Sequence, residues 1–595
     1  MLRRVWLLVG AAAAVLLLAA SATAKTTAAG SAALAGGTPA AAPFAQAWAN
    51  VPRTTAGREA SGNVVVAIDE DVNCWNQFLN ACNELVGGYM GFNETTDGPF
   101  IQNQKGDWTP TGITTSASAS TKGLTYTINP KAAWYEGGKK VPVTYKDFVY
   151  TLQQIVNPKN DVASPTGYAN LDPTHYTHSG NTVTFFWKTK NCTAAYPCGP
   201  FANWHYIFST LYPSVMASTD FNKMWANCIC DASGAPLSDG PYYMSNYTKG
   251  QGVVLKANPF WVGTKPSIPE VDFKLILDDN SEAQALRGGE VDMITPSFGS
   301  YLAPLQGQSG ITFSKIPGFY FEHLELREGH RPGAASLTHG ASNPLLQAPW
   351  MRQAVAMGID RQSIINTLYG SLAAGLKPLD GYLYYATQSQ YAPDFAKWNY
   401  NPTKALATLA KHCTGGPTAP DPSNTKIWTC SGYPAKFNWM TTTGQATRAT
   451  SEAIATAQLK AIGIQISDAS APANVVFGND GAIGGNYDIA EFAEITTGDP
   501  SDWETFYQCN GSGNYTGFCS KAADKLIIGG SSELDQAKHD ADFQAADKIL
   551  ANDIPVIPLY QRPNPLLYKS NLLGVVNNPG TAGMVWNIQN WHWKS

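Results

Sequence analysis

The chain has 595 residues, a formal net charge of −5 and a charged fraction of only 14%, well below the usual quarter of residues. Because basic residues do not gather in runs, the sequence offers no electrostatic footprint for nucleic acid and no polybasic patch for anionic lipid. About 530 residues follow the N-terminal 60, which is enough for two or more lobes with sizeable cores.

The N-terminal segment has the layout of a secretory signal peptide. Arg3 and Arg4 form its basic region, residues 5–20 form an apolar run, and Ala22-Thr23-Ala24 provides a small-residue cleavage site. An uncleaved membrane anchor is the alternative, but the apolar run is shorter than the roughly 20 residues that a spanning helix needs. No cysteine occurs within the first 73 residues, which excludes a lipoprotein anchor at this site.

Residues 25–60 are rich in Ala, Gly, Thr and Pro and show no sustained hydrophobic pattern, so we expect a disordered spacer. No later stretch of the sequence is long and apolar enough to predict a membrane span. We therefore expect a protein that is exported to the periplasm or the cell surface, with residues 1–24 removed as a cleaved signal peptide.

Strand and helix signals alternate along the rest of the chain, which is typical of an α/β protein. The β-rich runs predict strands at residues 63–68, 124–128, 182–187, 253–256 and 271–277. Helical spacing predicts helices at residues 143–155, 281–287, 350–368, 402–409, 450–462 and 534–551. Asn401 is the expected N-cap of the helix that begins with Pro402, and Gly288-Gly289 is the expected end of the helix at 281–287.

Four close sequence pairs account for eight of the ten cysteines: Cys74 and Cys82, Cys192 and Cys198, Cys413 and Cys430, and Cys509 and Cys519. In an exported protein such pairs are expected to form disulfides that staple loops. Neither a Cys-x2-Cys knuckle nor a paired Cys/His spacing supports the alternative of a zinc site. Cys228 and Cys230 are too close in sequence to bridge easily without strain, so no bond is expected between them.

The sequence contains no Gly-x-Ser-x-Gly elbow, no phosphate-binding loop and no His-Glu-x2-His motif. His175 and His178 could hold a metal, but in a loop near Pro173 they are expected to be solvated. Asp499 and Asp502, on either side of Ser501, could act as paired carboxylates, although turn and helix-cap chemistry is a sufficient reason for Asp499. We predict no catalysis, no cofactor and no metal, with a secreted hydrolase or a passive partner-binding module as alternatives.

Six segments carry a family resemblance when they are taken in chain order. They are residues 124–152 (LTYTINPKAAWYEGGKKVPVTYKDFVYTL), 239–265 (DGPYYMSNYTKGQGVVLKANPFWVGTK), 283–293 (AQALRGGEVDM), 352–370 (RQAVAMGIDRQSIINTLYG), 400–409 and 514–526 (NYTGFCSKAADKL). In this order and spacing they resemble the family 5 extracellular solute-binding proteins of ABC importers, which include dipeptide- and oligopeptide-binding proteins.

The resemblance implies a two-lobed periplasmic-binding-protein-like α/β fold with a hinge and an interlobe ligand cleft. Residues 61–317 and 560–595 would form lobe I and residues 318–559 lobe II, with crossings at Pro317-Gly318 and near Leu559-Tyr560. It also implies a monomer that captures a peptide or another small polar solute and delivers it to the permease subunits of an ABC importer.

The 17 Trp and 27 Tyr residues suit such a binding protein, because aromatic side chains form rigid walls around enclosed ligands. Trp75, Tyr320, Glu322 and His323 occupy positions that resemble cleft-lining segments of the family. These four residues are therefore candidate ligand contacts.

A second group of candidates lies in residues 439–448 (WMTTTGQATR), which resemble the loop that meets a ligand carboxylate in peptide binders. The candidates are Trp439, Thr442, Gln445 and Arg448. Arg448 is the only cation of this segment, and the alternative is that it lies on a helix surface.

The segment at residues 494–500 (EITTGDP) departs from the family pattern. Peptide binders have an aspartate two residues before the glycine, which pairs with the peptide ammonium group, whereas this chain has Thr496. A hydroxyl cannot balance a buried ammonium as a carboxylate does. We therefore expect an uncharged or amino-blocked ligand, unless Glu494 or Asp499 supplies the charge. Thr497 and Trp503 complete the set of candidate contacts.

We expect the mature protein to begin at Lys25, because Ala22-Thr23-Ala24, after the apolar run, is a small-residue site of the kind that a signal peptidase cleaves. The intact mass of the secreted product measures this. A product that still begins near Met1 would show that the segment is an uncleaved anchor.

Overall fold

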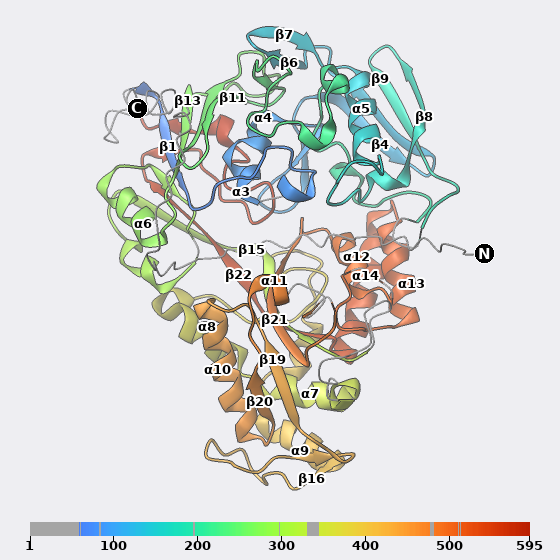
Figure 1. The fold of residues 1–595 in the computed structure, drawn as a ribbon, viewed down its shortest axis with the longest axis vertical. Helices are drawn as coiled ribbons and strands as arrows, with labels where there is room; N and C mark the ends of the chain where they lie inside the picture. The colour runs from blue at the N-terminus through green and yellow to red at the C-terminus, as the bar shows by residue number, and fades with distance from the viewer. Residues whose placement is uncertain are drawn as a thin grey trace, which may run out of the picture.

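The computed structural model describes residues 59, 61–82, 85–193, 197–296, 298–329, 344–476, 481–482, 484–509, 511 and 513–595. The signal peptide expected at residues 1–24 lies outside them, as does almost all of the spacer expected at residues 25–60. Among the described residues, helices that are long and apolar enough to cross a membrane do not occur. Figure 1 shows two lobes, the upper one built from the blue-to-green part of the chain together with its red C-terminal end.

A ten-stranded mixed sheet runs through both lobes. The two long strands in its middle pair with each other in antiparallel orientation and cross between the lobes. In spatial order the strands are β11 (Tyr242–Thr248), β12 (Gly252–Ala257), β13 (Glu270–Leu275), β1 (Val64–Ile68), β14 (Met293–Ile294), β22 (Val556–Lys569), β15 (Ile311–Leu326), β21 (Ile489–Ile495), β19 (Lys436–Met440) and β20 (Gln465–Asp468).

Strand β1 shows why the apolar run that opens the fold becomes part of a buried sheet. It pairs in parallel with β13 on one side and β14 on the other. Val64 and Val66 pack into one hydrophobic cluster, while Val65 and Ala67 pack into another, so both faces of the strand are covered. A parallel strand with two covered faces requires a continuous apolar sequence, which residues 64–68 supply.

Smaller sheets and the helices complete the lobes (Figure 1). The remaining strands are β2 (Phe100–Gln102), β3 (Trp108–Pro110), β4 (Thr114–Ser120), β5 (Gly123–Ile128), β6 (Ala133–Glu136), β7 (Lys139–Pro142), β8 (Leu171–Ser179), β9 (Thr182–Trp187), β10 (Leu237–Ser238), β16 (Cys413–Thr414), β17 (Thr429–Cys430), β18 (Tyr433–Pro434), β23 (Leu572–Leu573) and β24 (His592–Trp593). The α-helices are α3 (Leu85–Gly87), α4 (Asn93–Thr95), α5 (Tyr145–Ile155), α6 (Asp279–Gly288), α7 (Pro349–Gly358), α8 (Arg361–Tyr369), α9 (Pro402–His412), α10 (Ala446–Ala461), α11 (Ala473–Val476), α12 (Glu504–Tyr507), α13 (Lys521–Ser531) and α14 (Gln536–Asp553).

The predicted strands and helices are present with shifted ends, and capping explains two of the differences. The helix predicted at 143–155 begins at Tyr145, because Thr144 is an N-cap whose hydroxyl accepts from the Lys146 N–H. The helix predicted at 350–368 is two helices, α7 and α8. The Asp360 carboxylate accepts from the Ser363 N–H at 3.0 Å and so starts a new helix after Ile359.

His175 and His178 lie on strand β8, so the prediction of a loop was wrong. The His175 ring stacks on Phe186 and the His178 ring stacks on Tyr145. Residues three apart on a strand point to opposite faces, which separates the two rings. Within the residues that the structure describes, His, Cys, Asp and Glu form no group that could hold a metal ion.

Strands β15 and β22 are irregular where they pass between the lobes. Their register shifts between Pro317 and Phe321 and again between Glu322 and His323. Pro317 stands opposite Pro563, and proline has no N–H to donate to the ladder. The crossings expected at Pro317-Gly318 and Leu559-Tyr560 fall within these two strands, and the lobe boundaries themselves stay a prediction.

The four predicted cysteine pairs form disulfides. A fifth disulfide joins Cys228 and Cys230, so the expectation that these two would not bridge was wrong. With one residue between them, their Cα atoms lie 5.4 Å apart, which is inside the usual range for a disulfide.

We expect replacement of both Cys509 and Cys519 by serine to lower the free energy of unfolding by about 2–3 kcal/mol, because their bond closes a short loop before α13. Urea unfolding of wild type and variant measures the difference. Non-reducing peptide mapping that finds either thiol free, or equal stability of the two proteins, would contradict the expectation.

Candidate ligand-binding site

A cavity of about 190 Å³ lies beside the crossing strands and is walled by both lobes. Its upper wall includes Asp69, Glu70 and Tyr89. Its lower wall includes Tyr320 of β15 and Tyr369 of α8, and Arg562 of β22 lines it at the crossing. The rings of Tyr89, Phe298, Tyr320 and Tyr369 and charges of both signs thus line one cavity, which suits a small ligand with both apolar and charged parts.

The topology of the upper half of the sheet places the acidic residues at this cavity. Strands β13, β1 and β14 are parallel neighbours, so their carboxyl ends meet at one edge of the sheet. Asp69 and Glu70 directly follow β1, and Thr295 follows β14. Ligands of open α/β sheets bind in the crevice outside such strand ends.

Arg562 is the cation that lines the cavity where β22 crosses between the lobes. Its guanidinium carbon lies 5.4 Å from the centre of the Tyr320 ring. Its Nη1 lies 3.7 Å from Oε2 of Glu322, and its side chain keeps 33% exposure. The Tyr320 hydroxyl donates to the Pro563 carbonyl at 2.9 Å, which fixes the ring beneath the guanidinium.

A buried polar network lies behind this wall. The Glu322 carboxylate accepts from Nε of Arg448 at 2.7 Å, and both side chains are almost completely buried. Burial opposes ionisation of Glu322, but the guanidinium groups of Arg448 and Arg562 outweigh it and hold the pKa of Glu322 below its usual value. Trp439 Nε1 and the Ser451 hydroxyl donate to Glu491, the next carboxylate of the network.

Among the residues predicted from the sequence, Tyr320 lines the cavity, and Glu322, Trp439 and Arg448 form the network behind it. Arg448 does not lie on a helix surface, because its side chain is buried against Glu322. Thr442 is also buried, and among the described residues its hydroxyl has no hydrogen-bond partner. Gln445 stands at the N-cap position of α10.

Glu494 and His323 were also predicted from the sequence, but their side chains lie on the opposite face of the sheet from Tyr320. Glu494 belongs to the cavity wall, but it stands opposite Phe321 in the ladder and shares its face. Burial raises the pKa of Glu494 well above its usual value, and Glu325 adds to this rise. His323 is on the same face, with its Nε2 3.3 Å from Oε1 of Glu325.

Trp75 lies in the core of the upper lobe. Its side chain has no exposed surface, and its ring packs edge-to-face against Tyr247 with 5.0 Å between centroids. Trp503 is likewise buried, and it packs edge-to-face against Phe321. The described wall of the cavity includes neither tryptophan.

Thr496, Thr497 and Asp499 make local hydrogen bonds in the turn after β21. The Thr496 hydroxyl contacts the Tyr385 hydroxyl at 3.0 Å and accepts from the Gly498 N–H at 3.0 Å. The Thr497 N–H and hydroxyl both donate to Asp502 at 2.7 Å. Asp499 caps the next turn by accepting from the Ser501 N–H at 2.9 Å.

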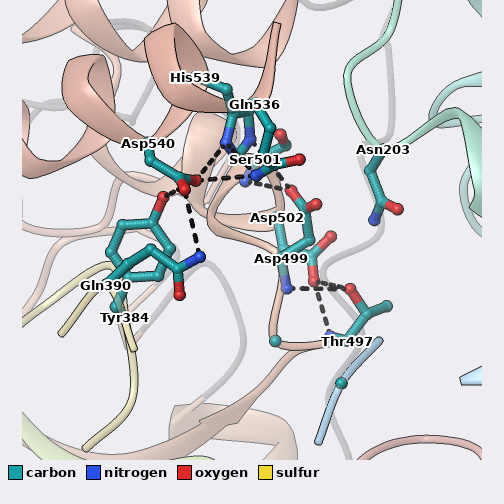
Figure 2. A network of polar contacts seen from close by, with 12 residues as sticks. Asn203, Tyr384, Gln390, Thr497, Asp499, Ser501, Asp502, Gln536, His539 and Asp540 are labelled. Carbon is teal, nitrogen blue, oxygen red and sulfur yellow. Dashed lines mark hydrogen bonds and ion pairs between the residues drawn. The ribbon is translucent and has the colours of Figure 1, made fainter. Parts of the chain in front are cut away.

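Figure 2 shows Thr497, Asp499 and Asp502 beside a second network centred on Asp540. The Asp540 carboxylate accepts from the Tyr384 hydroxyl and from amide groups of Gln390 and Gln536. Nδ1 of His539 lies 3.0 Å from Asp540, and Nε2 lies 3.9 Å from Asp499. The carboxylates of Asp499 and Asp502, on either side of Ser501, are thus engaged in turn and capping contacts.

Asp69, Glu70 and Arg562 were not predicted from the sequence. Asp69 and Glu70 could have been found from the sequence, because two acidic residues directly follow the first predicted strand. Arg562 was a lone cation between Gln561 and Pro563, and its position at the cavity depends on the pairing of β22 with β15.

The model of the bacterial extracellular solute-binding proteins, family 5 (Middle), matches residues 110–517. The chain is 26% identical over 474 residues to the oligopeptide-binding protein OppA of Mycobacterium bovis, covering 78% of this chain and 72% of that protein. It is 24% identical to the periplasmic murein peptide-binding protein MppA of Escherichia coli, covering 81% and 85%. The solved structure of the periplasmic EDTA-binding protein EppA superposes with a TM-score of 0.74 at 20% identity, covering 90% and 96%.

We expect Glu322→Gln to lower the free energy of unfolding by about 3 kcal/mol, because it leaves two guanidinium groups without their counter-charge. Burial, together with the charge of Glu322, raises the pKa of Glu491, so Glu491 can ionise in the variant and keep the loss near this value. Urea unfolding measures the loss.

The matched control is Glu290→Gln, which removes an exposed carboxylate paired with Lys274. This surface change should alter the free energy of unfolding by less than about 1 kcal/mol. Equal effects of the two substitutions would mean that the buried network does not stabilise the fold.

Proposed function

The chain belongs to the bacterial extracellular solute-binding proteins of family 5, and we propose that it encloses a peptide-like solute in the cavity between its lobes. It is the substrate-binding component of an ABC importer. The protein acts outside the cytoplasmic membrane, as a monomer, and passes its ligand to the permease subunits. It binds without chemical turnover.

The cavity beside the crossing strands is the observation that carries this proposal. Its walls come from both lobes, so a ligand inside it contacts both at once. The register shifts of β15 and β22 lie next to it, where the ladder is least regular. Closure about these strands, with residues 61–317 and 560–595 as one lobe and residues 318–559 as the other, would enclose the ligand.

Arg562 supports a ligand with an anionic or strongly polar end. Its guanidinium is 33% exposed while Glu322 holds it from behind. The guanidinium also packs over the Tyr320 ring. A carboxylate in the cavity would therefore meet a cation that is already oriented, at little cost in conformational entropy.

The residues around Ser501 do not favour the alternative of a hydrolase. The Ser501 hydroxyl has no hydrogen-bond partner among the described residues, and His539 Nε2 is also without one. A nucleophile and its base need to be within hydrogen-bond reach of each other. Both side chains are also buried, which denies a substrate access.

We expect a synthetic pool of di- to pentapeptides to raise the melting temperature in proportion to the logarithm of its concentration. Small-angle scattering should show compaction on binding, because the lobes close. Mass spectrometry of the pool after incubation serves as the check on turnover, and new cleavage products would overturn the non-enzymatic proposal.

In the same assay Arg562→Ala should weaken binding about 10- to 100-fold, the size of one hydrogen-bonded charge contact. Arg287→Ala, at the exposed end of α6, is the matched control and should leave binding unchanged. If the two variants bind alike, the cavity beside Arg562 is not the ligand site.

A further inference from the structure

A second cavity, of about 210 Å³, lies within the upper lobe (Figure 1). Its wall comes from segments far apart in the chain, namely α4, β2, β3, the loop after β12 and residues 585–589. In the described part of the chain, this upper-lobe cavity shares no wall residue with the cavity beside the crossing strands. A ligand inside it would therefore contact one lobe only.

Glu94 of α4 contributes a buried carboxyl group to this wall. It is 2% exposed, and neither of its carboxyl oxygens has a hydrogen-bond partner among the described residues. Burial raises the pKa of Glu94 well above its usual value, and Asp97, also in the wall, adds to this rise. Burial also raises the pKa of Asp97 to about 8. At neutral pH Glu94 therefore keeps its proton and offers one donor and one acceptor.

Trp261 contributes a second polar group without a partner. It is 7% exposed, and its indole Nε1, which can only donate, has no acceptor among the described residues. A Cβ added at Gly263, another wall residue, would lie 2.7 Å from this Nε1. Glycine at this position thus leaves the N–H edge of the indole uncovered. A buried donor without an acceptor is costly, and here it belongs to the same cavity wall as the unpartnered carboxyl of Glu94.

The rest of the wall combines apolar surface with uncharged polar groups. Trp586 already donates through its Nε1 to the Val576 carbonyl at 2.9 Å, so it offers its ring rather than a donor. Prolines and aliphatic side chains extend the apolar part, while threonines, Asn93 and Gln589 carry hydroxyl and amide groups. Lys, Arg and His do not occur in the described wall of this cavity.

We propose that the upper-lobe cavity is a second ligand site, which takes an uncharged, polyhydroxylated molecule about the size of one hexose. Rings and aliphatic groups suit the C–H surface of such a molecule, and its hydroxyls can accept from Trp261 and exchange hydrogen bonds with Glu94. An anion would meet no Lys or Arg in the described wall, and a cation would first have to displace the proton of Glu94.

This site goes beyond the proposed function, because it does not require the lobes to open or close. Pro110 and Thr264 belong to its wall and are exposed, so a ligand can enter directly from solvent. Occupancy of the upper-lobe cavity and of the cavity beside the crossing strands should therefore be independent of each other.

The test is saturation-transfer NMR on the exported protein with D-glucose, D-galactose and D-mannose. We expect saturable binding of at least one hexose, while gluconate and glucosamine, which are similar in size but charged, should bind at least about tenfold more weakly. A saturating peptide pool should leave the hexose affinity unchanged, and small-angle scattering should show no compaction with the hexose alone. If none of the three hexoses binds, the cavity holds only water and the second site is refuted, whereas the proposed function is judged on the peptide pool.

Trp261→Phe removes only the N–H and should weaken hexose binding about tenfold, the size of one neutral hydrogen bond. The matched control is Trp134→Phe in β6, whose Nε1 is also buried and unpartnered among the described residues but does not belong to this cavity wall. Because each change removes a donor without an acceptor, both variants should melt at or above the wild-type temperature when no ligand is present. Equal hexose binding by the two variants would refute the site.

Glu94→Gln keeps an uncharged donor and acceptor in nearly the same shape, so it should change hexose affinity less than about threefold, whereas Glu94→Leu should lower it at least about tenfold. Equal loss in both variants would show that Glu94 acts as an anion, and the uncharged ligand class would be wrong. Arg562→Ala should leave hexose binding unchanged. If it abolishes hexose binding while Trp261→Phe does not, the hexose occupies the cavity beside the crossing strands and the second site is refuted.

Discussion

The antiparallel pairing of β15 with β22 is the constraint on which both lobes depend, since these strands form the middle of the one sheet that runs through the molecule. Five strands continue this sheet on the side of β22 and three on the side of β15. Each lobe therefore takes its orientation from the same two strands. The register shifts near Pro317 and Glu322 place the least regular part of the ladder beside the cavity.

Charge is distributed unequally across that cavity. The upper wall receives the carboxyl groups of Asp69 and Glu70, because the loop after β1 leads to it. Where β22 crosses between the lobes, the cavity is lined by the guanidinium of Arg562, which contacts Glu322 and the Tyr320 ring of β15. A ligand that touches residues of both lobes in this cavity would favour the closed arrangement of the lobes.

The network of Glu322, Arg448 and Glu491 has a different role from the cavity wall. Arg448 was expected to meet a ligand carboxylate, yet its Nε is 2.7 Å from Glu322 and almost completely buried. Its charge sets the protonation of Glu322, which in turn holds Arg562. Arg448, whose position resembles a ligand contact, thus acts on Arg562 at the cavity through one intermediate carboxylate.

The sequence by itself determined the family, the α/β alternation, the strand at residues 64–68 and four of the five disulfides, because hydrophobic period, caps and cysteine spacing are local properties. It also identified Tyr320 as a cavity residue. It could not distinguish Trp75 and Trp503 as core residues, because an aromatic side chain suits a core as well as a binding wall. Only the tertiary structure decided that Asp69, Glu70 and Arg562 share one cavity, since they are brought together by strand pairings between residues far apart in the chain.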